Sequence, residues 1–257
     1  MKIFALADPH LSTGIQGKEM DKFGSAWRDH PRSIAANWRD AVGTDDLVLV
    51  AGDISWAMRL NQAMSDLQYL ASLPGRKVLI RGNHDYWWQA ISKVRAALPE
   101  RMYALQADAE SFGEVHVCGT RLWDVPGVSH SAYIDWSSGG ESSKSSADDE
   151  EQRLKIYRRE VERLKLALKS LQDLAGDSVN PVRIVMIHYP PCDASIPTNE
   201  LTELFEEFSI HHVIFGHLHD VKRTLSGTLW GQRAGVNYHL TSCDYLEFKP
   251  KVIAEIE

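Results

Sequence analysis

The sequence is poor in cysteine and lacks any long apolar run. Its three cysteines, Cys118, Cys192 and Cys243, are widely spaced and form no Cys-x-x-Cys pair, which argues against a disulfide framework or a cysteine-based zinc site. No stretch approaches the roughly 18 apolar residues of a transmembrane helix, and the first residues lack the features of a secretory signal. We therefore expect a cytoplasmic protein with reduced thiols and no membrane partner.

Basic residues are also in the minority. The 257 residues include 28 basic and 35 acidic side chains, a net charge of −7, so the chain lacks the positive field typical of nucleic-acid-binding proteins. A small phosphorylated substrate stays compatible with this charge, because bound cations reverse its sign locally. The length suits a single domain over residues 1–257. Nothing in the sequence indicates an oligomeric state.

Short apolar runs with turn signals behind them recur along the chain. Their continuity and β-branched residues suit strands buried on both faces of a sheet. They lie at Ile3–Ala7, Leu47–Ala51, Val78–Ile80, Val115–Cys118, Ile184–Ile187 and Val213–Phe215. Helical patterns lie between several of them, at Ser33–Val42, Met58–Leu73 and Leu201–Phe208, and this alternation predicts an α/β fold.

The C-terminal third departs from this alternation. Trp230–Leu240 and Leu246–Ile256 are strand-like and have no helix between them. We therefore expect them to build a second, largely antiparallel sheet that packs on the first.

Residues 125–180 predict a lid-like insertion. Within them, Ser137–Glu151 is small, polar and low in complexity, and buries too little apolar surface to order itself. An amphipathic helix is predicted next, with the apolar stripe Leu154, Tyr157, Val161, Leu164, Leu168 and Leu171. A helix that covers the core explains this stripe more simply than a coiled coil with a partner. Our hypothesis is that loop and helix form a lid beside the functional site.

Five polar blocks stand at the ends of apolar runs. Taken singly they are weak signals, since each histidine could be a buried structural residue, and Asn83 and Asp85 could cap a helix that begins near Tyr86. Together and in this order they indicate one functional site. The blocks are Asp8-Pro9-His10, Gly52-Asp53, Gly82-Asn83-His84-Asp85, His188 and Gly216-His217-Leu218-His219.

The side chains in these blocks suit metal ions. Imidazole, carboxylate and amide ligands without thiolate favour Mn²⁺, Fe or Zn²⁺ over Cu(I), and the many histidines disfavour Ca²⁺ and Mg²⁺. In two-metal hydrolases the cations lie roughly 3.5–4 Å apart, polarise phosphoryl oxygens and lower the pKa of a bound water. No protein nucleophile is then needed, and the sequence has neither a Gly-x-Ser-x-Gly motif nor a phosphate-binding Gly-rich loop that ends in Lys-Ser/Thr.

The blocks, written D-x-H, G-D, G-N-H-D, H and G-H-x-H, resemble the calcineurin-like metallophosphoesterase family, including its bacterial phosphohydrolases. The resemblance implies a four-layer α-β-β-α sandwich of two mixed sheets. It also implies two bound metals, Mn, Fe or Zn, and a hydroxide held by both that attacks phosphorus. Asp53 would bridge the metals, with Asp8, His10 and His219 completing the first site. The ligands that it implies are Asp8, His10, Asp53, Asn83, His188, His217 and His219.

Two further residues receive roles from the resemblance. His84 would face the substrate, stabilise the phosphoryl oxygens and protonate the leaving group. Asp85 would accept a hydrogen bond from His84 and fix its tautomer. Pro9 departs from the usual pattern of the family and predicts an extended backbone at Asp8.

Other side chains around the blocks stay as open possibilities. Most of the aromatic residues in these loops, such as Trp56 and Tyr86, are explained by packing, although one or two could stack on a ring of the substrate. Arg59 and Arg81 flank the blocks and could contact a phosphate. Arg81 could equally be a structural ion-pair partner.

Several functions are compatible with these residues. We expect a small phosphodiester or nucleotide-type substrate, because the chain is small and its insertion short. A phosphomonoesterase or protein phosphatase would use the same core residues and stays open. The acidic charge disfavours a nuclease. A non-catalytic scaffold with this fold, as in the retromer subunit of the superfamily, would predict eroded ligands, and every ligand of the pattern is present.

Overall fold

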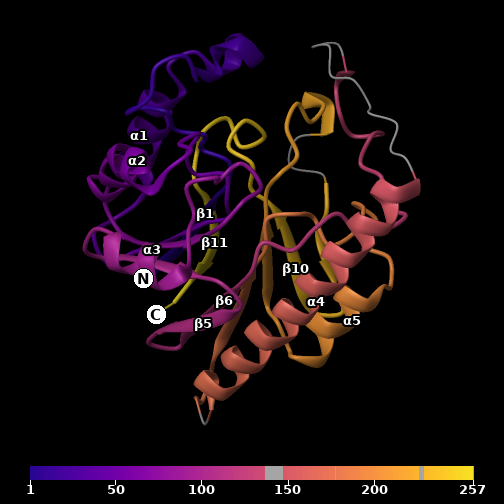
Figure 1. Cartoon of the computed structure of the whole chain (residues 1–257). Coiled ribbons are helices and arrows are strands. Elements are labelled where there is room, and N and C mark those ends of the chain that lie inside the picture. The colour runs from indigo at the N-terminus through magenta and orange to yellow at the C-terminus, as the bar shows by residue number, and fades with distance from the viewer. Residues whose placement is uncertain (137–146, 177, 226–228, 257) are drawn as a thin grey trace.

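The computed structural model describes residues 1–136, 147–176, 178–225 and 229–256. Two mixed β-sheets pack face to face, and helices cover the outer side of each (Figure 1). The N-terminal segments, in indigo, lie in one half together with the last strand of the chain, in yellow, and the orange segments lie in the other half. This is the four-layer α-β-β-α sandwich predicted from the sequence.

The first sheet has the strand order β11-β1-β2-β3-β4. Strands β1 to β4 are parallel to one another, and β11 joins the edge antiparallel to β1. The strands are β1 (Lys2–Leu6), β2 (Leu47–Val50), β3 (Arg76–Ile80), β4 (Met102–Leu105) and β11 (Lys251–Glu255).

The second sheet has the order β5-β6-β7-β8-β10-β9. Its inner four strands are parallel, and each edge strand pairs antiparallel with its neighbour. The strands are β5 (Asp108–Phe112), β6 (Val115–Gly119), β7 (Val182–Met186), β8 (His212–Phe215), β9 (Gln232–Arg233) and β10 (Val236–Leu240).

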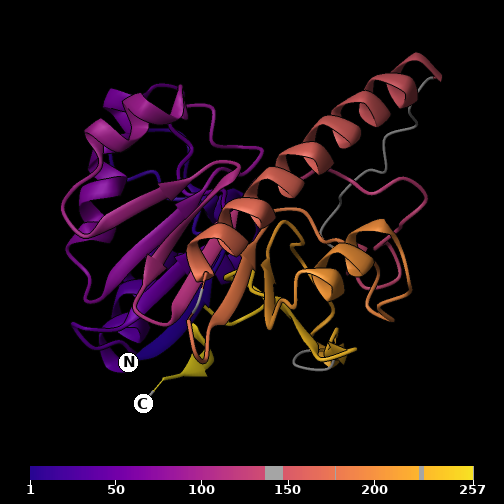
Figure 2. The same ribbon diagram turned by 90° about the horizontal axis from the view of Figure 1, so that it is seen from below.

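Helices α1, α2 and α3 cover the first sheet, and α4 and α5 cover the second. Figure 2 shows the two halves from below, with the N-terminal end of α4 extending past the sheets. The helices are α1 (His30–Ala41), α2 (Leu60–Ala71), α3 (Ile91–Ala97), α4 (Ala147–Ala175) and α5 (Glu200–Glu207), and short 3₁₀ turns lie at Met20–Phe23, Ser25–Trp27 and Arg223–Leu225. None of the helices in the described ranges has the length and apolar character needed to cross a membrane.

The parallel strands are mainly apolar because both of their faces are buried, and β2 is apolar at every position. In β2, Leu47 and Leu49 face the opposite sheet, whereas Val48 and Val50 pack against the helices. The same period of two places Ile184 of β7 between the sheets. The core therefore has three apolar layers, one between the sheets and one under each set of helices.

Helix α4 buries the apolar stripe predicted for it. Leu164, Leu168 and Leu171 are fully buried in the layer between this helix and the second sheet. Residues 137–146 of the expected loop lie outside the described residues. A lid function for residues 125–180 stays a prediction.

The expectation for the C-terminal third was wrong. Trp230–Leu240 is not one strand, because Ala234 and Gly235 have φ of 46° and 84° and turn the chain between β9 and β10. Strand β11 does not join the second sheet but pairs with β1 of the first, where Figure 1 shows the two side by side. The second sheet is consequently mixed: its central strands are parallel, and its two edge strands are antiparallel to their neighbours.

Candidate metal centre

The seven predicted ligands meet at the carboxyl ends of parallel strands from both sheets. Such strand ends share one edge, so the loops that follow them can converge. In the first sheet β1, β2 and β3 position Asp8, His10, Asp53 and Asn83, and in the second sheet β7 and β8 position His188, His217 and His219.

One half of the cluster contains Asp8, His10 and His219. Ligand atoms of these three side chains lie within 4.8 Å of one another. The Nε2 atoms of His10 and His219 are 3.1 Å apart, and Nε2 of His10 is 3.7 Å from Oδ2 of Asp53. Two imidazole nitrogens and two carboxylates thus face one small space.

The other half is centred on Asn83. Its Oδ1 atom is 2.7 Å from Nε2 of His188 and 3.0 Å from Nδ1 of His217. Oδ2 of Asp53 is 3.5 Å from Nε2 of His188. The Asp53 carboxylate therefore lies between the two halves, within 4 Å of a histidine in each.

The backbone around the ligands is folded in rarely adopted conformations. Asp8, His10, Asp53 and His217 have φ of 57°, 42°, 51° and 72°, in the left-handed region that side chains other than glycine seldom adopt. Such conformations concentrate at functional sites, where the surrounding structure holds them.

The predicted extended backbone at Asp8 was wrong despite the following Pro9. Asp8 donates from its backbone nitrogen to the Gly52 carbonyl at 3.0 Å, and its carboxylate accepts from the His217 backbone nitrogen at 2.9 Å. These tertiary bonds outweigh the local preference that proline imposes.

Glycines allow the loops to approach this closely. A Cβ atom on Gly82 would collide with the Asp53 carboxylate, and one on Gly216 would collide with Asp8. A Cβ atom on Gly52 would stand 2.6 Å from Nδ1 of His188. The three glycines in the sequence blocks are therefore required by the packing of the ligands.

Hydrogen bonds orient two of the histidines. Nδ1 of His188 lies 2.9 Å from the carbonyl of Ala51, and Nδ1 of His219 lies 3.0 Å from Oδ1 of Asp244. An Nδ1–H donated in this way leaves Nε2 of each ring free to bind a cation. Asp244 was not predicted, although it follows β10 just as the five blocks follow their strands.

The buried groups of the cluster shift the pKa values of one another. Burial raises the pKa of Asp8 to about 6. Burial also opposes the ionisation of Asp53, but His188 and His10 outweigh it and hold the pKa of Asp53 well below its usual range. The pKa of His188 rises to about 9 because Asp53 outweighs the effect of burial, and Asp244 raises the pKa of His219 to about 10 in the same way.

The remaining two imidazoles are neutral. Burial lowers the pKa of His10 and His217 well below the usual value. A neutral imidazole offers a lone pair to a metal. Cations bound here would neutralise the negative charge of the two carboxylates in place of protons.

His84 stands beside the cluster. Its backbone nitrogen donates to Oδ1 of Asp53 at 2.7 Å, and its ring lies 5.7 Å from that of His10. The expected bond from His84 to Asp85 is not formed in the part of the chain that the structure describes, where Nδ1 of His84 is buried without a partner.

Asp85 instead organises the backbone beneath the cluster. It accepts hydrogen bonds from the backbone nitrogens of Gly82, Ile54 and Ser55 at 2.8–3.1 Å, and from Nε1 of Trp87. The alternative role as a helix cap was also wrong, because α3 begins only at Ile91 and has no side-chain cap.

Aromatic rings lie next to His10 and His84. Trp56 stacks on His10 at 4.9 Å and lies 4.7 Å from the ring of His84. Tyr86 is 51 % exposed, and its ring lies 6.1 Å from that of His84. By contrast, Trp87 and Trp88 are buried and serve packing. Arg59 precedes α2 as its N-cap residue, and Arg81 lines a pocket beside the cluster.

The donor set fits divalent metal ions. It combines imidazole nitrogens, carboxylate oxygens and one amide oxygen, and no sulfur atom is part of it. Cys243 donates from Sγ to the Asp8 carbonyl, and burial raises the pKa of Cys192 to about 12, so both remain thiols. In addition, Nδ1 of His10 is buried without a hydrogen-bond partner among the described residues.

Parts of the chain are similar to known proteins. The model of the calcineurin-like phosphoesterase family matches residues 1–221. The Gene 66 protein of Mycobacterium phage D29 is 35% identical over 83 residues, which are 32% of this chain and 40% of that protein. The Gene 66 protein of Mycobacterium phage L5 is 42% identical over 57 residues, 22% of this chain and 27% of that protein. The chain thus matches less than half the length of either phage protein.

Solved structures resemble the whole chain at low sequence identity. The phosphopantetheinyl hydrolase of Mycobacterium tuberculosis is 14% identical with a TM-score of 0.50, and the match covers 98% of this chain and 95% of that one. A protein of unknown function from Aquifex aeolicus is 12% identical with a TM-score of 0.47, over the same shares of the two chains. The first of these shows a common fold.

Proposed function

Because the chain belongs to the calcineurin-like phosphoesterase family, we propose that it hydrolyses a small phosphodiester or nucleotide-type substrate with the help of two metal ions. The observation that carries this proposal is the position of Asp53. Its Oδ2 atom lies 3.7 Å from Nε2 of His10 and 3.5 Å from Nε2 of His188, between the two groups of ligands. A carboxylate has two oxygens and can bridge two cations.

The ligands would hold the metals in two groups that share Asp53. Asp8, His10 and His219 would complete one site, and Asn83, His188 and His217 the other. When bound, such cations supply Lewis acidity at phosphoryl oxygens and a water of lowered pKa. Mn, Fe and Zn all suit this donor set.

The chain itself would orient the substrate and supply a proton. The His84 backbone is tied to the Asp53 carboxylate at 2.7 Å, which keeps the imidazole next to the metals. From there His84 would stabilise a phosphoryl oxygen and protonate the leaving oxygen. Asp85 supports this position through the backbone of the Gly82 turn.

The surroundings of His84 support a small substrate that carries a ring. Trp56 and Tyr86 flank the imidazole at 4.7 and 6.1 Å, and Tyr86 is half-exposed. Their faces could stack on a base or another ring. Because its cysteines are all free and buried, the protein suits a reducing compartment such as the cytoplasm.

Metal content and a panel of phosphate esters test this proposal. After reconstitution with Mn²⁺, Fe²⁺ or Zn²⁺, we expect about two metals per chain and faster hydrolysis of bis-p-nitrophenyl phosphate than of p-nitrophenyl phosphate. Dinucleotides should also be cleaved. Faster hydrolysis of the monoester would favour a phosphomonoesterase, and a protein without metal and without activity would support a scaffold.

A further inference from the structure

The two loops that follow β1 and β2 continue the parallel pairing of these strands past the end of the first sheet. The backbone nitrogen of His10 donates to the Asp53 carbonyl at 3.0 Å, and that of Leu11 donates to the Ile54 carbonyl at 2.9 Å. The backbone nitrogen of Trp56 donates in return to the Leu11 carbonyl at 2.9 Å. The candidate ligands on the two loops are therefore held in one register.

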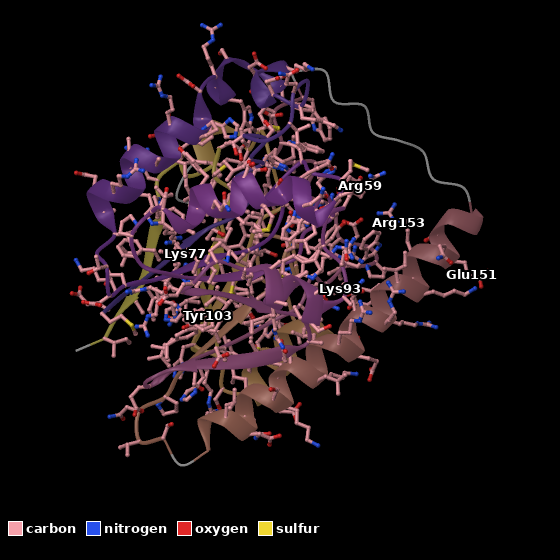
Figure 3. The ribbon with its side chains drawn as sticks, turned by 60° about the vertical axis from the view of Figure 1, so that its left-hand side comes forward. Arg59, Lys77, Lys93, Tyr103, Glu151 and Arg153 are labelled. Carbon is pink, nitrogen blue, oxygen red and sulfur yellow. The ribbon has the colours of Figure 1, made fainter. Side chains whose placement is uncertain are left out.

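One carboxylate of α2 binds both loops. Asp66 accepts hydrogen bonds at Oδ1 from the backbone nitrogen and from Oγ1 of Thr13 in the first loop, at 2.7 and 2.5 Å. Its Oδ2 atom accepts from Oγ of Ser55 in the second loop at 2.5 Å. In Figure 3, Arg59 marks the point where the second loop leads into α2. We call Thr13, Ser55 and Asp66 the Asp66 cluster.

The Asp66 cluster is buried although it contains a carboxylate. Asp66 is fully buried, and Ser55 is 1% exposed. A buried carboxylate costs free energy unless hydrogen bonds satisfy it, and the donors of Thr13 and Ser55 satisfy both of its oxygens. An apolar side chain would fill the same space without this cost. Packing alone therefore does not explain an aspartate at this position.

The candidate ligands on both loops need support from the surrounding structure. His10 and Asp53 have φ of 42° and 51°, left-handed conformations that cost free energy and persist only where neighbouring groups hold them. The first loop lies directly against α2, because a Cβ atom on Gly14 would stand 2.8 Å from Oγ of Ser65. Contacts with α2, those of Asp66 included, therefore supply part of this support.

We infer that Asp66 is a positioning residue of the metal centre, which holds the two loops so that His10 and Asp53 face the same space. This inference rests on the proposed function and extends the site to a residue of α2. Nε2 of His10 and Oδ2 of Asp53 lie 3.7 Å apart, so a small movement of either loop would separate them. Trp56, the neighbour of Ser55, also stacks on the His10 ring at 4.9 Å. The second loop thus orients a ligand of the first.

Hydrogen–deuterium exchange on the metal-free protein tests this role without catalysis. In Asp66→Ala, the backbone amides of Leu11, Thr13 and Trp56 should exchange about tenfold faster than in the wild type, since hydrogen bonds that hold the loops are lost. The amides of β1 and β2 should keep their protection. Gln68→Ala, at an exposed position of the same helix, is the matched control and should change nothing. Wild-type exchange in both loops of Asp66→Ala would overturn the inference.

The affinity for Mn²⁺ distinguishes positioning from a purely structural role. Measured by electron paramagnetic resonance well below the melting temperature, the Kd should rise about tenfold in Asp66→Ala. It should rise less in Asp66→Asn, whose amide oxygen can still accept from Thr13, and this variant also serves if Asp66→Ala does not fold. Ser55→Ala should weaken binding too, and should add little to the loss in Asp66→Ala. A lower melting temperature with an unchanged Kd would show a structural role only and refute the inference.

Failure of this inference is distinguishable from failure of the proposed function. A wild-type protein that binds no Mn²⁺ would contradict the proposed function, while the exchange rates of the metal-free loops would still decide whether Asp66 holds them. A wild-type protein that binds two metals, with equal affinity in Asp66→Ala, would support the proposed function and contradict the inference. Circular dichroism verifies that each variant compared is folded.

Discussion

His84 lies next to the ligand cluster without belonging to it, so its loss should separate metal binding from turnover. We predict that His84→Ala keeps its metals and lowers kcat by about 10²–10⁴-fold, the usual contribution of a general acid. Metal analysis and steady-state kinetics on one sample provide the measurement. His211→Ala, at an exposed histidine away from the site, should leave both quantities unchanged. Near-normal turnover in His84→Ala would refute the assigned role.

Asp244 contacts the candidate ligand His219. Its carboxylate lies 3.0 Å from Nδ1 of that ring and also accepts from the Asp220 backbone. We predict that Asp244→Ala weakens metal binding by about 10–100-fold, as removal of such supporting carboxylates does. Asp244→Asn should lose less, because an amide oxygen can still accept the hydrogen bond.

A Mn²⁺ titration followed by activity measures this effect. Excess metal should restore much of the turnover of Asp244→Ala, which a variant that is merely misfolded would not show. Asp40→Ala, on the exposed face of α1, provides the control. Equal metal affinity in Asp244→Ala and the wild type would exclude a role for Asp244 in positioning His219.

The sequence could locate the candidate ligands because each lies close behind an apolar run. Their convergence then follows from the parallel arrangement of the strands. The partners of Asp85 could not be predicted in this way, because Ile54 and Ser55 reach it from another loop. Glu160 and Arg121 come together only when α4 packs on the second sheet, so sequence spacing gave no indication of their ion pair.

Among the secondary-structure elements, the buried strands were predicted, whereas the edge strands β4 and β5 were missed. Strand β5 has the sequence Asp-Ala-Glu-Ser-Phe, of which only Phe112 is buried, so it lacks an apolar run. Strand β4 has only four residues and is too short to be recognised from the sequence. The pairing of β11 with β1 joins the two ends of the chain, and local periodicity contains no information on such a long-range partner.

Neighbouring strands β8 and β10 contain a histidine pair that makes the stability of the fold depend on pH. Nδ1 of His212 lies 3.0 Å from Nε2 of His239. Burial lowers the pKa of His212 to about 4, with a further contribution from His211, and burial together with Lys251 lowers the pKa of His239 to about 3. The unfolded chain, with a histidine pKa of about 6.5, therefore binds more protons than the folded chain in this range.

Stability contributed by this pair is fully present above pH 6.5 and is lost as the pH falls toward 4 and 3. We predict that His239→Gln reduces the acid-dependent loss by about 1 to 2 kcal/mol, after allowance for partial exposure. Urea unfolding at pH 7 and pH 4.5 measures the difference, with Lys169→Gln, an exposed change that removes no group titrating in this range, as the control. Identical pH dependence in His239→Gln and the wild type would argue against this assignment.

Across the whole molecule, the metal centre links the two sheets. Asp8, Asp53 and Asn83 follow strands of the first sheet, whereas His188 and His217 follow strands of the second. Bound metals would consequently stabilise the packing of one half on the other. We predict that free metal at 100 times its Kd raises the free energy of unfolding by about 2.7 kcal/mol per site.

Thermal unfolding with Mn²⁺ and with EDTA tests this linkage. The melting temperature should rise with metal concentration in the wild type and stay constant in Asp53→Ala, which lacks the shared ligand. A rise of the same size in Asp53→Ala would place the metal somewhere else.

The central claim is that Asp53 joins two metals in one catalytic site. Metal stoichiometry and hydrolysis of bis-p-nitrophenyl phosphate, determined on the same preparations of wild type and Asp53→Ala, test it most directly. The account predicts about two metals and steady turnover in the wild type, and loss of both in Asp53→Ala. Full diesterase activity in Asp53→Ala, or in metal-stripped wild type, would contradict it.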